Sequence, residues 1–289
     1  MFRRAIWSVL HPLGSVTTEY TDVLVEDNPD ADHWVELAWR HVRATCNTDL
    51  IDLPFVSIDS RLHRVIGEER PMVAWGNFVS SVNWDGYQDW ENYYQARKRD
   101  FRRSLRVTRH RLGQRGNLTF DMINDAEQIA RTVSWIFLHK TEWLIRTKQG
   151  GPWRDRELYE KFLIKVMTAE RQELEGLHAF SLKLDGRIMS AALCRISRSG
   201  MEGVIGAFEQ SFRQYGPGQL LYEDILKWAF KRGLNFDFRL GNDKYKTRWT
   251  NQESNVNSYR FVNSNWGSAF ALASRSRSKL GCLGRMFRA

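Results

Sequence analysis

Residues 204–230 read VIGAFEQSFRQYGPGQLLYEDILKWAF and contain, in order, an apolar run, a glycine-rich hexapeptide and a helical pattern. The run Val204–Phe208 is typical of a strand, and the apolar spacing after the hexapeptide predicts a helix. The hexapeptide itself, Arg213–Gly218, has two glycines that permit a sharp turn and let a ligand approach the backbone. Its proline suits the first turn of a helix. A helix that begins after such a loop presents backbone N–H groups and a positive dipole to a phosphate.

A pair of glycines before a helix also occurs as a plain turn, so the context of the hexapeptide matters. A second apolar strand, Phe236–Leu240, follows the helix. The pattern is neither the dinucleotide-binding G-x-G-x-x-G nor a Walker loop, which requires Gly-Lys-Ser/Thr. The string R-x-x-G-x-G between a strand and a helix resembles the pyrophosphate loop by which the GNAT acyltransferases bind acyl-CoA. This resemblance favours a phosphate-bearing cofactor over a plain turn.

Composition limits the class of protein. The chain has 289 residues, 42% of them hydrophobic, with twelve Trp, which is enough for a packed core in one large domain or two smaller ones. No apolar stretch is long enough to span a bilayer, and the basic start of the chain is interrupted too early for a secretory signal. Three distant cysteines and seven scattered histidines predict neither a disulfide framework nor a metal site. We therefore expect a cytoplasmic protein without a metal.

The net charge of +9 is concentrated in two segments. Residues Arg97–Arg115 hold nine bases and one acid, and Arg275–Arg288 hold five bases and no acid. Such segments fit a polyanionic partner, which could be a cofactor phosphate, an anionic membrane or nucleic acid. For any single arginine, a solvated helix face is the better interpretation.

Periodicity along the chain predicts helices and strands in an α+β order. Asp185-Gly186 is a hairpin signal between two of the strands. The predicted helices cover 29–46, a single long helix Tyr87–Leu112, a helix opened by Asp125, one over 155–172, and one after Gly218. The predicted strands cover 50–58 (with some loop), 73–82, 118–120, 178–184, 188–196, 202–208, 236–240 and 256–262.

The likeness to the GNAT acyltransferases extends beyond the hexapeptide, to the type associated with cellulose and exopolysaccharide biosynthesis. More distantly, the chain is similar to the Fem-type aminoacyltransferases, which use a duplicated GNAT fold and take aminoacyl-tRNA. The match is carried by the basic helix Arg97–Arg106, the hairpin Asp185–Leu193, the loop Arg213–Leu221 and the segment Phe236–Lys246 with Trp249 after it. The resemblance implies a mixed, mostly antiparallel sheet covered by helices. It implies a partial N-terminal GNAT-like region at 1–80, an acyltransferase domain at 81–265 and a basic tail at 266–289.

The resemblance also implies direct attack of an amine or hydroxyl on an acyl-CoA thioester, acetyl or longer, held between the strands 202–208 and 235–240. Acyl transfer needs an oriented thioester and a proton for the departing thiolate. Tyr245 is the candidate acid, with simple packing as an equal alternative. Asp237, in an otherwise apolar strand, is the first candidate base. An anchor for the loop is a slightly better interpretation of that residue, and Glu209 is the second candidate base.

The candidate cofactor-binding residues lie in or after the loop: Arg213, Tyr215, Gly216, Gly218, Gln219 and Lys246. Two other classes of function compete with this assignment. A nucleic-acid-binding protein would explain the basic helix and the tryptophans but not the glycine loop. A Fem-like transferase would share the fold, although no sustained heptad pattern predicts its helical arm. We expect a polysaccharide, lipid-linked or small-molecule acceptor, and peripheral contact of the basic tail with the inner membrane.

Overall fold

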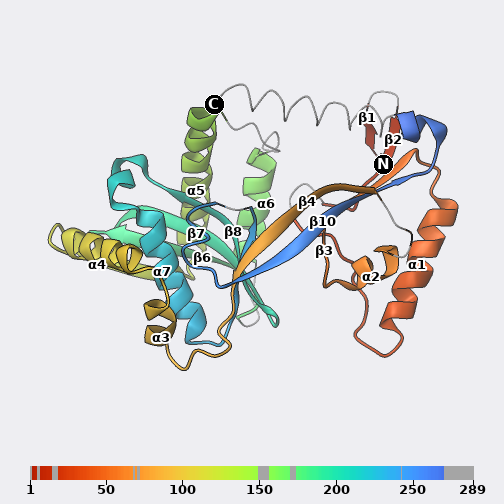
Figure 1. Cartoon of the computed structure of the whole chain (residues 1–289). Helices are drawn as coiled ribbons and strands as arrows, with labels where there is room; N and C mark the ends of the chain where they lie inside the picture. The colour runs from red at the N-terminus through yellow and green to blue at the C-terminus, as the bar shows by residue number, and fades with distance from the viewer. Residues whose placement is uncertain are drawn as a thin grey trace, which may run out of the picture. The chain divides into compact units, whose positions relative to one another are not determined.

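A computed structural model describes residues 2–4, 7–14, 19–67, 69, 72–148, 156–169, 174–241 and 243–269 (Figure 1). The chain forms two compact units. Unit 1 comprises Met1–Phe78 and Ser254–Ala289, and unit 2 comprises Val79–Glu253. Unit 2 is therefore inserted into unit 1. Residues 254–265 group with the N-terminal part, whereas the resemblance implies that they belong to the acyltransferase domain. The basic tail segment Arg275–Arg288 lies outside the described residues.

Unit 1 is built from strands on which two helices pack. Its strand order is β1-β2-β3-β10-β4, in which β2 and β3 are parallel and β3 and β10 antiparallel. Trp39 of α1 packs on Phe261 of β10 with ring centroids 4.7 Å apart, inside a cluster that also includes Leu62 and Ile66 of α2. The elements are β1 (Phe2–Arg4), β2 (Trp7–Leu10), α1 (Ala31–Thr45), β3 (Leu50–Ser57), α2 (Arg61–Gly67), β4 (Met72–Val82) and β10 (Gln252–Val262).

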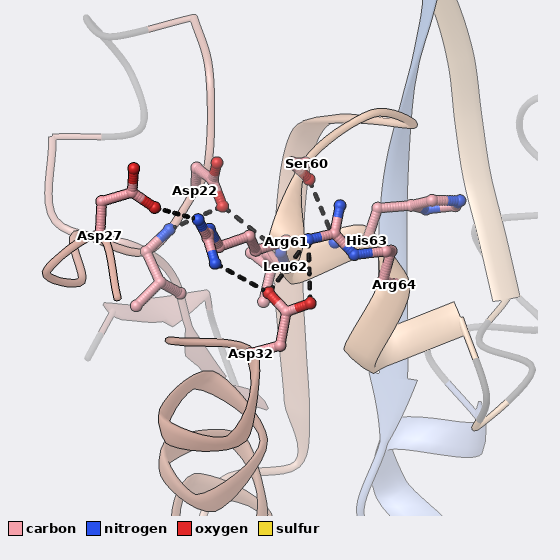
Figure 2. A network of polar contacts seen from close by, with 9 residues as sticks. Asp22, Asp27, Asp32, Ser60, Arg61, Leu62, His63 and Arg64 are labelled. Carbon is pink, nitrogen blue, oxygen red and sulfur yellow. Dashed lines mark hydrogen bonds and ion pairs between the residues drawn. The ribbon is translucent and has the colours of Figure 1, made fainter. Parts of the chain in front are cut away.

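Ion pairs at the surface of unit 1 join α2 to α1 and to the segment before it (Figure 2). Arg61 donates to Asp27 at 2.6 Å and to Asp32 at 3.1 Å, and Arg64 donates to both carboxylate oxygens of Asp32. The hydrogen bond from Arg64 is the largest of the effects that lower the pKa of Asp32. Because these groups are largely exposed, we expect them to orient the helices rather than to add much stability.

Unit 2 contains a sheet of order β4-β9-β8-β7-β6-β5, antiparallel between β5 and β8. Asp185 and Gly186 form the β6–β7 turn with φ of 48° and 79°, which confirms the predicted hairpin. The strands are β5 (Leu118–Ile123), β6 (Gly176–Leu184), β7 (Arg187–Ser197), β8 (Gly200–Phe208) and β9 (Phe236–Leu240). The helices are α3 (Trp90–Gln95), α4 (Arg99–Gly113), α5 (Ala126–Thr147), α6 (Arg156–Thr168) and α7 (Pro217–Phe230).

Alternate side chains of the unit 2 strands point to two separate cores. Phe180 and Leu182 of β6 join a cluster with α3, α4 and α7, whereas Ala179 joins a cluster with α5 and α6. Helices therefore cover both faces of the sheet, and α4 and α7 lie side by side on one of them (Figure 1). This arrangement confirms the predicted α+β fold with a mixed, mostly antiparallel sheet.

The predicted single helix Tyr87–Leu112 is wrong, because the chain forms two helices there. Asp89 caps α3 by accepting from Asn92 N–H at 2.7 Å, and Lys98 is extended with ψ of 132° before α4 begins. Between the two helices, the Arg97 guanidinium donates to the carbonyls of Trp249 and Thr250 at 2.9 and 2.8 Å. These tertiary contacts hold the break, and apolar periodicity carries no sign of them. Strands β1 and β2 were not predicted either.

Candidate donor site

The two strands on either side of the glycine loop pair with each other only where they begin. Met201 of β8 is opposite Phe236 of β9, and Glu202 is opposite Asp237. Beyond these pairs β8 continues beside β7, to Phe208 opposite Ser190, while β9 stays paired with β4, from Phe236 opposite Val82 to Leu240 opposite Val79. The two strands therefore separate, as the resemblance to the GNAT acyltransferases implies, and backbone amides of both border the opening.

A bulge in β8 lies at the start of this separation. Cys194 of β7 is opposite Gly203 and Leu193 is opposite Ile205, so one residue of β8 is extra in the ladder. A Cβ at Gly203 or at Gly206 would lie 3.6 Å from the Tyr222 hydroxyl of α7. The two glycines thus lie beside one tyrosine hydroxyl.

The hexapeptide forms the connection from β8 to α7. Residues Gln210–Tyr215 make a short 3-10 helix, Gly216 takes a left-handed conformation with φ of 53°, and Pro217 is the first residue of α7. A Cβ added at Gly216 or Gly218 would meet no atom within 4 Å. Open space therefore faces the first turn of α7, where helical N–H groups lack an intrahelical partner. The predicted strand, loop and helix are confirmed.

Three of the predicted cofactor-binding side chains are arranged differently around this loop. The side-chain amide of Gln219 is hydrogen-bonded within the protein. It accepts from the Trp249 indole N–H at 2.9 Å and donates to the Tyr245 carbonyl at 3.5 Å. Tyr215 is half-buried and carries the Arg115 guanidinium over its ring at 5.2 Å. Arg213 is exposed.

Tyr245, the candidate acid, lies among aromatic rings next to the separated strands. Its ring stacks on Tyr222 with centroids 5.7 Å apart and planes 23° apart, and it meets Phe238 of β9 edge-on at 6.3 Å. Burial raises the pKa of Tyr222 well above its ordinary value, and electrostatic interactions with Tyr245 and Cys194 and a hydrogen bond to Tyr245 act in the same direction. Tyr222 therefore stays protonated and is a partner for Tyr245 that the sequence did not indicate.

The two candidate bases are both engaged within the protein. Asp237 is half-buried and its Oδ1 accepts from the N–H of Arg239, a residue with a left-handed φ of 61°. Glu209 is paired with Arg187 and accepts from the Ser211 hydroxyl at 2.7 Å. Burial opposes ionisation of Glu209, but these hydrogen bonds and the charge of Arg187 outweigh it and lower the pKa of Glu209. A lowered pKa makes Glu209 a weak base at neutral pH.

Lys246 is buried, and its amine bonds to the end of β9. It is 4% exposed, and its amine donates to the carbonyls of Leu240 and Arg239, the latter at 3.4 Å. The amine thus holds the end of β9 where that strand has left β8.

A hollow of about 430 Å³ lies between the end of α4 and the hexapeptide. Arg111, in the last turn of α4, and Arg115, in the turn just after that helix, both line it. Sequence analysis identified the basic segment but not these two residues. The lining comprises Thr108, Arg111, Gln114, Arg115, Gln214 and Tyr215.

Within the described part of the chain, no group of His, Cys, Asp or Glu side chains is arranged to hold a metal ion. None of the helices described there is both long and apolar enough to cross a membrane.

The family model for the acetyltransferase (GNAT) domain matches residues 99–247, which is more than half of the chain. The chain therefore belongs to the GNAT acetyltransferase-domain family, and it carries a transferase domain. The search of curated proteins found no matching relative.

Solved structures show the same fold at low sequence identity. FemX matches with a TM-score of 0.60 and 13% identity, over 84% of this chain and 80% of that chain. The C-terminal domain of a putative lysylphosphatidylglycerol synthetase from Agrobacterium fabrum matches with a TM-score of 0.59 and 13% identity, over 89% and 80%. L-PGS from Bacillus licheniformis matches with a TM-score of 0.53 and 9% identity, over 86% and 79%.

Proposed function

We propose that the protein is an acyl-CoA-dependent acyltransferase that transfers an acetyl or longer acyl group to an amine or hydroxyl. The observation that carries this proposal is the separation of β8 from β9 directly before the loop that opens α7. A linear pantetheine arm with two amides matches backbone groups on separated strands, and the first turn of α7 matches a pyrophosphate.

In the proposed reaction the acceptor nitrogen or oxygen attacks the thioester carbonyl carbon. The C–S bond breaks, and the Tyr245 hydroxyl gives its proton to the leaving thiolate. The acceptor loses a proton to a base, for which Asp237 is the better candidate because Glu209 is held by Arg187. The hydrogen bond from Arg239 N–H to Asp237 also supports an anchoring role for that carboxylate. The position of Lys246 supports a role in holding β9 rather than a direct phosphate contact.

For the acceptor, we propose a chemical class rather than a particular molecule. The resemblance to acyltransferases of cellulose and exopolysaccharide biosynthesis supports a polysaccharide, lipid-linked or small-molecule acceptor. The lipid-linked alternative also draws support from the fold shared with the lysylphosphatidylglycerol synthetase domain. We propose that the enzyme works in the cytoplasm, in contact with the inner membrane.

Aminoacyl-tRNA is the second candidate donor. The fold is shared with FemX and with the lysylphosphatidylglycerol synthetase domain. The Fem-type aminoacyltransferases, which the chain distantly resembles, take aminoacyl-tRNA, and this resemblance favours the second donor. Exposed bases of α4, among them Arg99, Arg103 and Arg106, are available to an RNA backbone. A thioester donor releases a thiol and an aminoacyl ester does not, so the two donors can be separated chemically.

The experiment is a thiol-release assay with a panel of acyl-CoA chain lengths and a mixture of amine and hydroxyl acceptors. Free CoA released in an acceptor-dependent way is the expected result. A parallel assay supplies charged tRNA and follows loss of the aminoacyl group. Activity confined to the tRNA assay would replace the proposal by the second candidate.

A further inference from the structure

We infer that the hollow beside the hexapeptide is a phosphate-recognition site, and that it binds the 3′-phosphate on the ribose of the donor's coenzyme A. This inference rests on the proposed function and names a part of the donor that the separated strands and the first turn of α7 do not account for. The hollow is formed by the end of α4 and the turn after it on one side, and by Gln214 and Tyr215 on the other.

The charge of the hollow is the first reason. Among the described residues no acid pairs with Arg111, and Arg115 contacts an aromatic ring rather than a carboxylate. Arg109 of the same helix provides the contrast, because it donates to Glu223 at 2.7 Å and to Asp224 at 3.0 Å. Two guanidinium groups without an opposing carboxylate attract a dianionic group more strongly than either would alone.

The acid near the end of α4, Asp185, is engaged in a hydrogen bond of its own. Asp185 lies against Gly116, just past α4, and its Oδ1 accepts from Asn117 N–H at 2.8 Å. Asp185 does not line the hollow. The carboxylate therefore bonds the chain between α4 and β5, and it is not part of the lining.

The position of the hollow is the second reason. Gln214 and Tyr215 belong to the hexapeptide, so a ligand in the hollow lies next to the loop proposed for the pyrophosphate. Stacking of Arg115 on Tyr215 joins the two places. In coenzyme A the phosphorylated ribose is attached directly to the pyrophosphate, which makes it the part of the donor that reaches a site adjoining the loop. The remaining lining groups, a hydroxyl and two amides, can donate hydrogen bonds to phosphate oxygens or contact the ribose.

The test measures binding of two ligands that differ only in this phosphate, CoA and dephospho-CoA, to the full chain by calorimetry. We expect the wild-type protein to bind CoA about tenfold more tightly. In Arg111→Gln with Arg115→Gln the preference should fall to roughly twofold or less, because the phosphate then has no guanidinium to meet. Arg103→Gln is the matched control on the same helix, since Arg103 is exposed and does not line the hollow. It should keep the preference.

Each outcome has one meaning. Equal affinity of the wild-type protein for the two ligands would overturn the site while leaving an acyl-CoA donor in place. A preference that survives the double substitution would overturn the assignment to these arginines. No binding of either ligand, together with charged tRNA binding that the double substitution weakens, would overturn both this site and the proposed donor. Added salt should reduce the preference, since exposed charges are screened.

Discussion

Tyr245 is the residue on which the proposed chemistry depends most directly. Its stacking on Tyr222 and its contact with Phe238 place the ring at the edge of the separated strands. Sequence analysis identified Tyr245 as a candidate but did not identify its partner Tyr222. Tyr222 falls within the apolar pattern of α7, so its sequence environment does not distinguish it from a core aromatic.

We expect Tyr245→Phe to lower kcat by roughly ten- to a hundredfold while leaving KM for acyl-CoA nearly unchanged. The reason is that a general acid stabilises the transition state by donating its proton and contributes little to binding of the substrate. Steady-state kinetics with thiol release measures both constants. Tyr259→Phe removes a tyrosine hydroxyl from the core cluster of unit 1, outside the proposed site, and should leave kcat unchanged. An unaltered kcat in Tyr245→Phe would reduce this residue to a packing role.

A substitution at Gly218 tests whether the loop binds the pyrophosphate of CoA. A valine side chain there would meet no protein atom at its Cβ, so Gly218→Val should fold, yet its methyl groups would enter the space in front of α7. We expect CoA affinity to fall at least tenfold, about 1.4 kcal/mol, measured by calorimetry. Gly67→Val at the end of α2 is the matched control, because its Cβ also has open space. Unchanged affinity in a folded Gly218→Val protein would contradict the loop assignment.

At the scale of elements, the contact of α4 with α7 holds the hexapeptide beside the basic helix. Asp224 of α7 is 17% exposed and accepts from Arg109. Burial raises the pKa of Asp224 to about 6, although the charge of Arg109 works against this shift. The folded protein therefore holds a proton on Asp224 over a range in which the unfolded chain has released it.

The sign of the resulting pH dependence follows from proton uptake. Below about pH 4 the carboxyl is protonated in both states, so this part of the stability is fully present there. It is lost as the pH rises through about 6, by roughly 3 kcal/mol at most. In Asp224→Asn this loss should disappear, so the variant should gain stability relative to the wild type between pH 4 and 6. Urea unfolding at several pH values measures the difference.

Glu223→Gln is the control for that experiment, because it removes the other carboxylate that contacts Arg109. It should keep most of the decline in stability with rising pH, because burial raises the pKa of Asp224 more than the charge of Glu223 does. A parallel decline in Asp224→Asn and the wild type would show that another group titrates.

The elements of unit 2 were largely predictable because local signals specify them. The Asp125 cap accepts from Gln128 N–H at 2.8 Å, the Asp185-Gly186 turn forms its hairpin, and Pro217 begins α7. What local signals lack is information about partners far along the chain. The break between α3 and α4 depends on carbonyls at Trp249 and Thr250, and beyond its first residues β9 keeps its pairing with β4 but not with β8. The same reason explains why two arginines so close in sequence differ in role. Arg109 forms ion pairs with α7, whereas Arg111 lines the hollow.

At the scale of the whole molecule, the distribution of basic residues leads to a prediction about membranes. The segment Arg275–Arg288 lies outside the described residues, and its five bases motivate the proposed contact with anionic lipid. We expect the full chain to co-sediment with anionic vesicles at low salt and to lose this binding at high salt. A chain ending at Ala269 should bind less, and it retains Ser264, whose hydroxyl donates to Asp49 at 2.5 Å. Equal sedimentation of the two chains would exclude the tail and leave α4 as the remaining basic surface.

Because unit 2 is inserted into unit 1, the order of synthesis bears on how the protein reaches its native state. Asp52 of β3 pairs with Arg260 of β10, which lies 208 residues later in the chain. At 5–20 residues per second, the ribosome takes about 10 to 40 s to deliver that partner after β3 has emerged. Unit 2, whose strands β5 to β8 pair with their neighbours in sequence, can fold in that interval. During translation β3 therefore exposes the edge that β10 later covers, and until then this edge is open to pairing with another chain.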